Sequence, residues 1–457
     1  MFLEKWYGQE GLQQIRKKLA TPPLHTSLRC NTLKTNTQAL INKLNLQFED
    51  HISNTGNKFE SVPSLPDGII LKTNTQALIN KLNLQFEDHI SNTGNKFESV
   101  PSLPDGIILK TNKTPPPAPC YPGVVVDKCC GESVLRGAHV FIKGILGAAN
   151  HLKLGDKVSV WADLQGVTLR GEAVNQINPQ FVFVGNGITK AHRSLLITQS
   201  PGIGVEMTES LYTNPSLNNI FPDELFLQTI PSMLVGHIVG PQPGETILDM
   251  CAAPGGKTSH ISALSNNACT IVATEKKQGK LSPFKKTLER LGVTCVTAFS
   301  YDANKLLADK VDLVGEMRKG VEPPFPAEYF DCILLDPPCS GLGNRPRLRD
   351  DMTLKNLLGF SEYQKRLFEV AFSLLKRGGR LVYSTCTINP LENEEIVSWA
   401  LQKYSKELVL DSVPQFKDFA QPGLSNSSLD EASKAKVLRF DPSSTLDDIG
   451  FFIAKFQ

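Results

Sequence analysis

Two cysteines stand at the carboxyl ends of apolar segments typical of buried strands. The run 381–387, LVYSTCT, encloses Cys386 in small polar residues, and the run 332–336, CILLD, leads to Cys339 in PPCSG. Two strands that each deliver a thiol at the carboxyl end indicate one site with two cysteines. A thiolate is a soft nucleophile, suited to conjugate addition to an electron-poor ring such as carbon 6 of a pyrimidine. The alternative is that both cysteines are merely small buried side chains.

Addition of a thiolate to carbon 6 makes carbon 5 of the ring a nucleophile that can accept a methyl group. A base must then remove the proton from carbon 5 before the thiolate is eliminated. Chemistry of this kind has a use for two neighbouring polarisable groups, and the pair Cys339 and Cys386 meets that need.

A turn rich in small residues, LDMCAAPGGKT at 248–258, follows an apolar strand and opens a helix. Small residues let a ligand approach the backbone, and the amides of a helix N-terminus favour anionic or polar groups. Ordinary tight turns also use glycine, and the turn matches neither a dinucleotide GxGxxG nor a P-loop, so a nucleoside-binding oxidoreductase is disfavoured. The residues expected to contact a nucleoside-type cofactor here are Cys251, Ala252, Ala253, Pro254, Gly255, Gly256 and Lys257.

Carboxylates follow three further strands. Glu275 ends the strand 270–274, Asp302 follows the strand 294–299, and Asp336 ends the strand 331–335. In open α/β sheets a ligand lies past the carboxyl ends of the strands, where these groups are expected to face ribose, adenine amine and substrate, respectively. A lone strand-end aspartate is usually a turn or cap residue, but three in register favour a ligand site.

Strands and helices alternate from residue 241 to 457. Helices are expected at 277–291, 362–376 and 390–404, and strands at 247–250, 270–274, 294–299, 331–335, 379–385 and 450–456. This alternation is typical of a doubly wound α/β sheet. Asn389, Pro390 and Glu392 form a capping-box-like start, so the third helix is expected to direct its positive end toward Cys386.

The order LDMCAAPGGKT, LLDPPCSGLGNRP, YSTCTINPLENE closely resembles the Nop/Sun family of S-adenosylmethionine-dependent RNA cytosine-5 methyltransferases, from about residue 225 to the terminal GFFIAKF. The resemblance implies a Rossmann-like sheet that binds S-adenosyl-L-methionine. It also implies that Cys386 is the nucleophile, that Cys339 assists proton removal or product release, that Asp336 holds the flipped cytosine and that Lys257 positions the base. Glu275 stands where the family more often has aspartate.

The N-terminal part, 1–114, contains a perfect tandem duplication in which 33–70 recurs letter for letter at 71–108. Genuine solenoid repeats drift apart in sequence, so identical copies are more typical of a recent duplication or an error in the gene model. One copy is therefore expected to be redundant to the fold and looped out. RCNTLK at 29–34 resembles the family's RNA-recognition signature, within a region expected to be α+β.

Residues 115–203 begin with a proline-rich linker at 115–119. Short strands separated by glycines are expected at 123–126, 138–142, 157–161, 181–184 and 195–198, which favours a small β-barrel. This segment carries eight basic and five acidic residues, a local net charge of +3. Composition alone leaves nucleic-acid and protein partners open. VLRGAHV and VGNGI within it resemble a PUA domain, inserted before a connecting part at 204–240.

That layout resembles the family's sixth member, which implies a cytosine near the 3′ end of the tRNA acceptor stem as the target and a PUA domain that grips the CCA tail. The residues expected to contact RNA are Arg29, Arg136, Lys143, Arg170 and Asn186. Ribosomal or messenger RNA as the substrate, and a non-catalytic RNA-binding protein, are the alternatives.

The chain of 457 residues has a net charge of only +2, so any basic RNA-binding surface must be local. It lacks a signal-peptide pattern and an apolar run of roughly 18 residues, so we expect no membrane span, a cytoplasmic location and reduced cysteines. None of the ten cysteines has zinc spacing, so no metal is expected. We expect a monomer.

Overall fold

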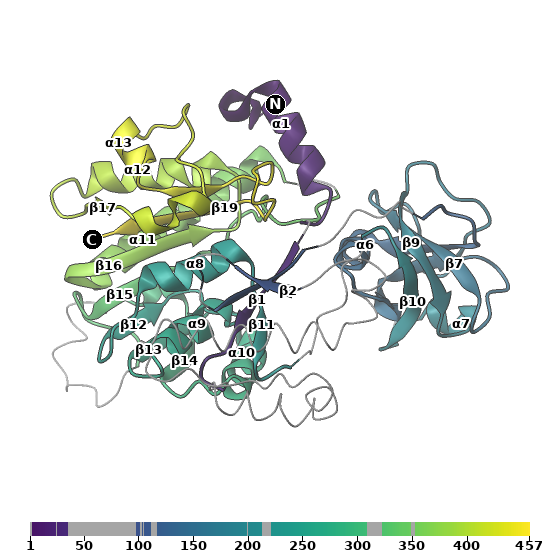
Figure 1. Ribbon diagram of the computed structural model, residues 1–457, viewed down its shortest axis with the longest axis horizontal. Coiled ribbons are helices and arrows are strands. Elements are labelled where there is room, and N and C mark those ends of the chain that lie inside the picture. The colour runs from purple at the N-terminus through teal and green to yellow at the C-terminus, as the bar shows by residue number, and fades with distance from the viewer. Residues whose placement is uncertain are drawn as a thin grey trace, which may run out of the picture.

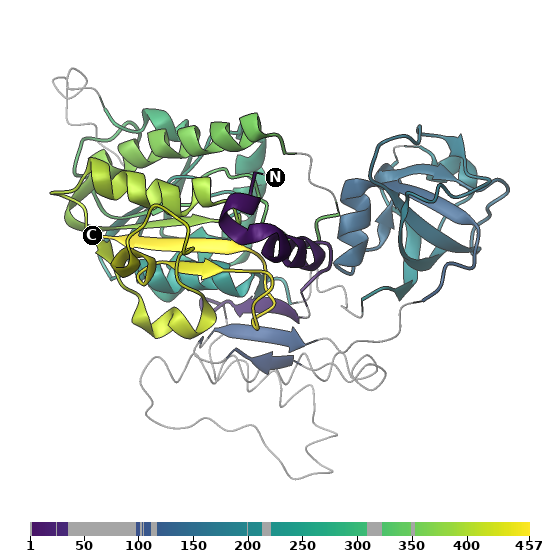
Figure 2. The same cartoon turned by 90° about the horizontal axis from the view of Figure 1, so that it is seen from above.

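The computed structural model describes residues 2–23, 25–34, 97–100, 103, 105–110, 117–198, 200–212, 221–308, 322–348 and 352–457. It consists of a large α/β part and a smaller β part set to one side of it, as two perpendicular views agree (Figures 1 and 2). The first repeat copy lies almost wholly outside the described residues. The prediction that one copy is redundant to the fold concerns residues that are not described. No helix in these ranges is long and apolar enough to cross a membrane.

The large part is built on one sheet, in the order β14-β13-β12-β15-β16-β19-β17, with β18 paired to β19. The first five strands in this order run parallel to one another. The strands are β12 (Thr246–Asp249), β13 (Thr270–Glu275), β14 (Val296–Ser300), β15 (Phe330–Leu335), β16 (Leu375–Thr385), β17 (Leu410–Asp411), β18 (Leu438–Phe440) and β19 (Phe451–Phe456). This arrangement confirms the Rossmann-like α/β prediction.

Apolar residues on the central strands alternate between two cores, one on each face of the sheet. Ile247 and Leu334 pack on one side, whereas Leu248 and Leu335 pack on the other. The first core includes residues of α8 (Ile230–Val239) and α9 (Gly256–Leu264), and the second includes residues of α11 (Leu354–Leu374) and α12 (Glu394–Lys403). Burial on both faces explains why these strands are continuous apolar runs.

The final strand β19 lies where it was expected and runs antiparallel to β16. Two helices differ from the expected elements. Helix α11 begins at Leu354, eight residues before the expected start, because Thr353 and Asn356 form a capping box there. The expected helix 390–404 is broken: Pro390–Glu392 forms a 3₁₀ turn, and α12 starts only after Asn393, whose backbone is not helical.

The N-terminal region contributes α1 (Glu4–Leu19) and a sheet in the order β11-β1-β3-β2. Its strands are β1 (His25–Cys30), β2 (Phe97–Ser99), β3 (Gly106–Lys110) and β11 (Leu225–Leu227). Strands β2 and β3 come from the second repeat copy and its end, whereas β11 returns from the segment after the small β part and pairs with β1. This sheet lies beside α8 and α9 (Figure 1).

The small β part has one sheet in the order β5-β10-β9-β7-β4-β6-β8. Its elements are β4 (Gly123–Asp127), α6 (Lys128–Leu135), β5 (Val140–Phe141), β6 (Ile145–Ala148), β7 (Lys157–Asp163), β8 (Glu172–Ala173), β9 (Val182–Thr189), α7 (Arg193–Leu196) and β10 (Ile203–Ser210). Residues from strands far apart in this order, such as Val140 of β5 and Ala148 of β6, share one core, so the sheet curls around it.

Two expectations for this part are wrong. The boundary at residue 203 falls at the first residue of β10, which pairs with β5 and β9 and so belongs to the small β part. The expected strand at 195–198 is instead the short helix α7, because His192 starts a helical turn that Ile197 closes.

Candidate active site

The two cysteines that the sequence placed at strand ends lie together. Strands β15 and β16 are parallel and in register, with Leu335 opposite Tyr383. After each strand the backbone leaves the sheet at the same edge, and the sulfur atoms of Cys339 and Cys386 are 3.4 Å apart. The prediction of one site with two thiols is confirmed.

The loops that carry the thiols are joined by hydrogen bonds next to each cysteine. The hydroxyl groups of Ser340 and Thr387 lie 2.8 Å apart. The backbone N–H of Gly343 donates to the carbonyl oxygen of Cys386 at 3.1 Å. These hydrogen bonds join the two loops and so hold the sulfur atoms near each other.

A fully buried glutamate supports the same pair of loops. Glu392 Oε2 accepts a hydrogen bond from the backbone N–H of Ser340 at 2.9 Å and from Gln364 Nε2 at 2.9 Å, and Oε1 accepts from Asn389 Nδ2 at 2.8 Å. A buried carboxylate is stable only with such donors. Asn389 also accepts from Leu391 N, so it caps the 3₁₀ turn rather than α12. The expected helix dipole directed at Cys386 is therefore replaced by this hydrogen-bonded network.

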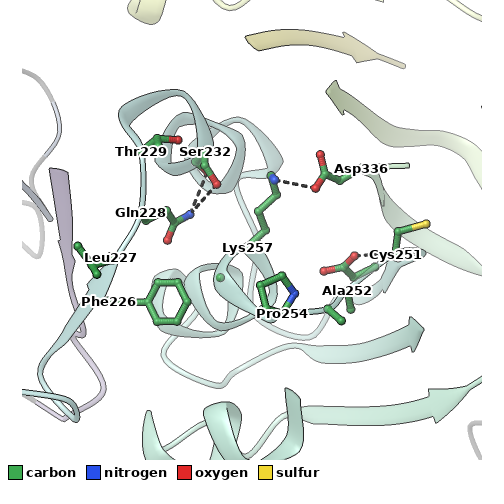
Figure 3. Close-up of a pocket in the computed structure, with 13 residues that line it drawn as sticks. Phe226, Leu227, Gln228, Thr229, Ser232, Cys251, Ala252, Pro254, Lys257 and Asp336 are labelled. Atoms are coloured by element: carbon green, nitrogen blue, oxygen red, sulfur yellow. Dashed lines mark hydrogen bonds and ion pairs between the residues drawn. The ribbon is translucent and has the colours of Figure 1, made fainter. Parts of the chain in front are cut away.

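Asp336 and Lys257 form an ion pair beside the thiols. The ammonium of Lys257 is 2.7 Å from Asp336 Oδ2, and the hydroxyl of Ser384 donates to Asp336 Oδ1 at 2.7 Å. Lys257 comes from the first turn of α9, and Figure 3 shows it reaching across the pocket to Asp336. Each carboxylate oxygen retains lone pairs, so Asp336 can still accept a hydrogen bond from a substrate amine.

The environments of the two sulfur atoms differ. The pKa of Cys386 is lowered by the hydrogen bond from Cys339 and by the charge of Lys257, against the effect of burial. The same hydrogen bond, together with burial and the carboxylate of Glu392, raises the pKa of Cys339 well above its ordinary value. The two thiols are therefore not equivalent, and Cys386 is the one that ionises more readily.

The small-residue turn after β12 lines a pocket that opens beside this pair. Of the residues expected to hold the cofactor, Cys251, Ala252, Ala253, Pro254, Gly256, Lys257 and Asp336 line it. Gly255 has a positive φ of 105°, and a Cβ on Gly256 would lie 2.9 Å from the ring of Phe226. The N-cap residue of α9 is Gly255, which has no side chain to cap the first turn, so the amides there can face a ligand. This open turn of small residues fits a nucleoside-type cofactor such as S-adenosyl-L-methionine.

Two carboxylates expected at the cofactor lie at the same edge of the sheet but outside the lining of this pocket. Glu275 ends β13 and lies 3.7 Å from Lys280, and Asp302 lies 2.9 Å from Lys276. Asp249, at the end of β12, is instead buried in the pocket wall, accepts from Thr258, and has its pKa raised to about 6 by burial.

Sequence reasoning missed one wall of the pocket. Phe226, Gln228, Thr229 and Ser232 line it from β11 and the start of α8. Figure 3 shows Phe226 and Gln228 on one side of Lys257, with Asp336 and Cys251 on the other. The LFLQT stretch carries no motif, and only the pairing of β11 with β1 brings it to the site.

Two of the residues expected to bind RNA are buried, which contradicts a role in direct contact. Arg29 is fully buried and donates to Gln228 Oε1 at 2.9 Å and to Ser259 Oγ at 2.8 Å. Asn186 is also buried, hydrogen-bonded to Ser159 and Glu209. Both stabilise the fold, because a polar side chain withdrawn from water needs internal partners.

The other three expected RNA contacts are exposed on the small β part. Arg170 donates to the carbonyl oxygens of Ile145 at 2.5 Å and Lys143 at 2.7 Å, so much of its guanidinium is occupied. Lys143 is exposed, and Arg136, at the end of α6, lines a groove that leads toward the active site.

A cluster of Asp105, His237 and His260 joins β3 to α8 and α9. The Asp105 carboxylate is 2.8 Å from His237 Nε2 and 2.6 Å from His260 Nε2. The side-chain atoms that could bind a metal all lie within 4.8 Å of one another. No metal site was expected from the sequence, so this cluster was not predicted. The positive charge of the nearby buried Arg29 opposes a cation there, and it also contributes to lowering the pKa of His260.

Taken together, the parallel sheet, the open cradle after its first strand and the paired thiols at its edge define a Rossmann-like methyltransferase of the cytosine-5 type. The family model described as 16S rRNA methyltransferase RsmB/F matches residues 237–457. The chain is 41% identical over 73% of its length to the mouse tRNA (cytosine(72)-C(5))-methyltransferase NSUN6, of which it covers 74%. The human protein of that name is also 41% identical, with the same coverage of 73% and 74%.

A structure described as NSun6 from Pyrococcus horikoshii with SFG, an S-adenosylmethionine analogue, matches all of this chain and 96% of its own, with 29% identity and a TM-score of 0.73. This chain belongs to the Nop/Sun family of S-adenosylmethionine-dependent RNA cytosine-5 methyltransferases.

Proposed function

We propose that this enzyme methylates carbon 5 of a cytosine near the 3′ end of the tRNA acceptor stem. The observation that carries the proposal is the likeness, over almost three quarters of each chain, to relatives named for cytosine 72 of tRNA, joined to a paired-thiol site of the geometry that the reaction needs. Pyrococcus horikoshii has a protein of the same printed activity, 31% identical over the whole of this chain.

In the proposed reaction, the Cys386 thiolate attacks carbon 6 of the cytosine, with the Cys339 thiol 3.4 Å away. Asp336 accepts a hydrogen bond from the exocyclic amine, and Lys257 holds that carboxylate in place. Residues 251–257 would hold S-adenosyl-L-methionine, which would supply the methyl group to carbon 5. Removal of the carbon 5 proton then restores the double bond between carbons 5 and 6 and breaks the bond between carbon 6 and the Cys386 sulfur, and Cys339 assists this release step.

A groove between the two parts of the molecule supports an RNA path to this site. Ser133 and Arg136 line it from α6, and Arg345 and Asp448 line it from the large part. Its floor includes Leu227, Gln228 and Thr229, which also line the cofactor pocket. We infer that the small β part is a PUA domain whose bound 3′ end enters the groove past Arg136.

The test is transfer of a labelled methyl group to purified RNA. Unmodified tRNA transcripts should accept one methyl group at a cytosine of the acceptor stem, mapped by bisulfite sequencing, and removal of the CCA end should abolish transfer. Transfer that does not depend on the acceptor stem would overturn the proposal.

Ribosomal RNA is the second candidate substrate. An Arabidopsis thaliana protein named rRNA (cytosine-C(5))-methyltransferase NOP2C is 31% identical over the whole chain and is covered to 89%. Methylation of ribosomal RNA fragments in preference to tRNA in the same assay would favour it.

A further inference from the structure

The two active-site sulfur atoms are near enough to bond to each other. Their separation of 3.4 Å exceeds the length of a disulfide, about 2.05 Å, by little more than an ångström. Methyl transfer uses the two thiols in separate steps, and neither step forms a bond between the sulfur atoms. The contact therefore makes a second reaction available to the same pair.

The surrounding loops hold the thiols in this position. Ser340 and Thr387, the residues that follow the two cysteines, are hydrogen-bonded at 2.8 Å, and Gly343 N donates to Cys386 O at 3.1 Å. Ser340 is further anchored by the buried Glu392. Because both loops are tied together, the two sulfur atoms are held within 3.4 Å of each other.

The pair also has the chemical asymmetry of an attacking and a resolving cysteine. Cys386 has the lowered pKa, and the thiolate is the form that oxidants attack. The hydrogen bond to Cys386 and burial raise the pKa of Cys339. Neither is fully buried, whereas Cys332 on β15 is wholly enclosed.

We propose that Cys339 and Cys386 form a reversible disulfide when the enzyme meets a hydroperoxide, which makes this pair an oxidation site as well as a catalytic one. The Cys386 thiolate attacks one oxygen of hydrogen peroxide, the O–O bond breaks, and the leaving hydroxide takes a proton from solvent, which gives sulfenic acid and water. The Cys339 sulfur then attacks the Cys386 sulfur, the S–O bond breaks, and the leaving hydroxide takes the proton of the Cys339 thiol and departs as a second water. Two thiols lose two electrons, and one peroxide becomes two waters.

The disulfide removes both the nucleophile and the releasing thiol, so the oxidised enzyme is inactive until a dithiol returns two electrons. It also protects Cys386, because a sulfenic acid that meets a neighbouring thiol is not carried on to the irreversible sulfinic acid. The loss of methylation rests on the proposed function, whereas formation of the disulfide does not.

The experiment treats the reduced full-length protein with a small excess of hydrogen peroxide, blocks free thiols with N-ethylmaleimide and maps the non-reduced peptides by mass spectrometry. The expected result is a cross-link between the peptides of Cys339 and Cys386, with transfer to tRNA falling to below about a tenth and returning after dithiothreitol. Cys339→Ala should lack the cross-link and should accumulate Cys386 sulfinic acid that dithiothreitol does not reverse.

A variant with Cys120→Ser and Cys129→Ser is the matched control, because both thiols are exposed and distant in sequence from the site. It should behave as the wild type. A second hydrogen-bonded pair, Cys269 and Cys295, precedes β13 and β14 at the opposite edge of the sheet, and peptide mapping separates its products.

The outcomes distinguish the two proposals. A Cys339–Cys386 cross-link in a protein that never methylates RNA would support the disulfide and remove the proposed function. An active enzyme in which peroxide yields only sulfinic acid at Cys386, or a cross-link confined to Cys269 and Cys295, would overturn the inference.

Discussion

The hydroxyl groups of Ser340 and Thr387 lie 2.8 Å apart, and each belongs to the residue that follows one of the two active-site cysteines. This bond joins two loops that leave the sheet from adjacent parallel strands. It explains why the sulfur atoms meet although 47 residues separate them in the chain. The reactive pair is thus a property of the paired loops rather than of either motif alone.

The division of labour between the thiols can be tested by trapping. Cys386→Ala should abolish methyl transfer, because the thiolate that attacks carbon 6 is missing. Cys339→Ala should instead accumulate a covalent protein–RNA adduct, because the attack proceeds and the release does not. Denaturing gel electrophoresis of each variant with tRNA and S-adenosylmethionine measures this, and recovery of only free protein from Cys339→Ala would refute the assignment.

Glu392 is expected to affect catalysis by holding the two cysteine loops in position. Glu392→Gln replaces one acceptor oxygen by an amide that faces the donors of Ser340, Gln364 or Asn389. A buried donor without a partner costs about 1–3 kcal/mol, so we expect a lower melting temperature and a kcat reduced about tenfold or more. A shift in the pH dependence of Cys386 alkylation would show that the loops have moved, because general instability would not change that profile.

Glu407→Gln is the control for that variant, because Glu407 is exposed and belongs to no loop of the site. It should leave kcat, melting temperature and the alkylation profile unchanged. Unchanged kinetics in both variants would mean that the buried carboxylate does not position the thiols.

Two arginines should show opposite responses to substitution. Arg136→Ala should weaken tRNA binding about three- to tenfold at low salt and less at high salt, because phosphate contacts are screened. Arg29→Ala should mainly lower stability, because its partners Gln228 and Ser259 are buried with it. Filter binding at two salt concentrations and thermal unfolding measure the two effects.

Lys153→Ala, at an exposed position that does not line the groove, is the control for binding. Equal loss of affinity in Arg136→Ala and Lys153→Ala would argue for diffuse attraction to RNA rather than a defined path along the groove.

The Asp105 cluster predicts a loss of stability in mild acid. Burial is the main cause that lowers the pKa of His260 to about 4, whereas an unfolded histidine has a pKa of about 6.5. Below the unfolded value the unfolded chain binds more protons than the folded one, so stability is full above it and falls as the pH drops toward the folded value. The loss from this residue should reach about 2 kcal/mol at pH 5.

Chemical denaturation at pH 7.5 and pH 5 measures that loss. His260→Gln should make the difference between the two pH values smaller, whereas the same change at the exposed His192 should not. An identical pH dependence in wild type and His260→Gln would show that the cluster does not titrate on unfolding.

The sequence by itself determined the alternating strands and helices of 241–457, the small-residue turn and the two strand-end cysteines. Local sequence patterns specify these features, because apolar runs indicate buried strands and turn residues end them. The family could also be recognised from the sequence, because its motifs are short and contiguous. The expected helix 390–404 failed locally, where the backbone breaks at Asn393.

Only the tertiary structure decided which side chains face the site and which support it. Arg29 and Asn186 were expected at the RNA surface, yet they are buried, because their burial depends on partners far away in sequence. Phe226 and Gln228 reach the cofactor pocket only through the pairing of β11 with β1, across about two hundred residues of chain. The contact between Cys339 and Cys386 likewise needs two parallel strands in register, and no local pattern specifies that register.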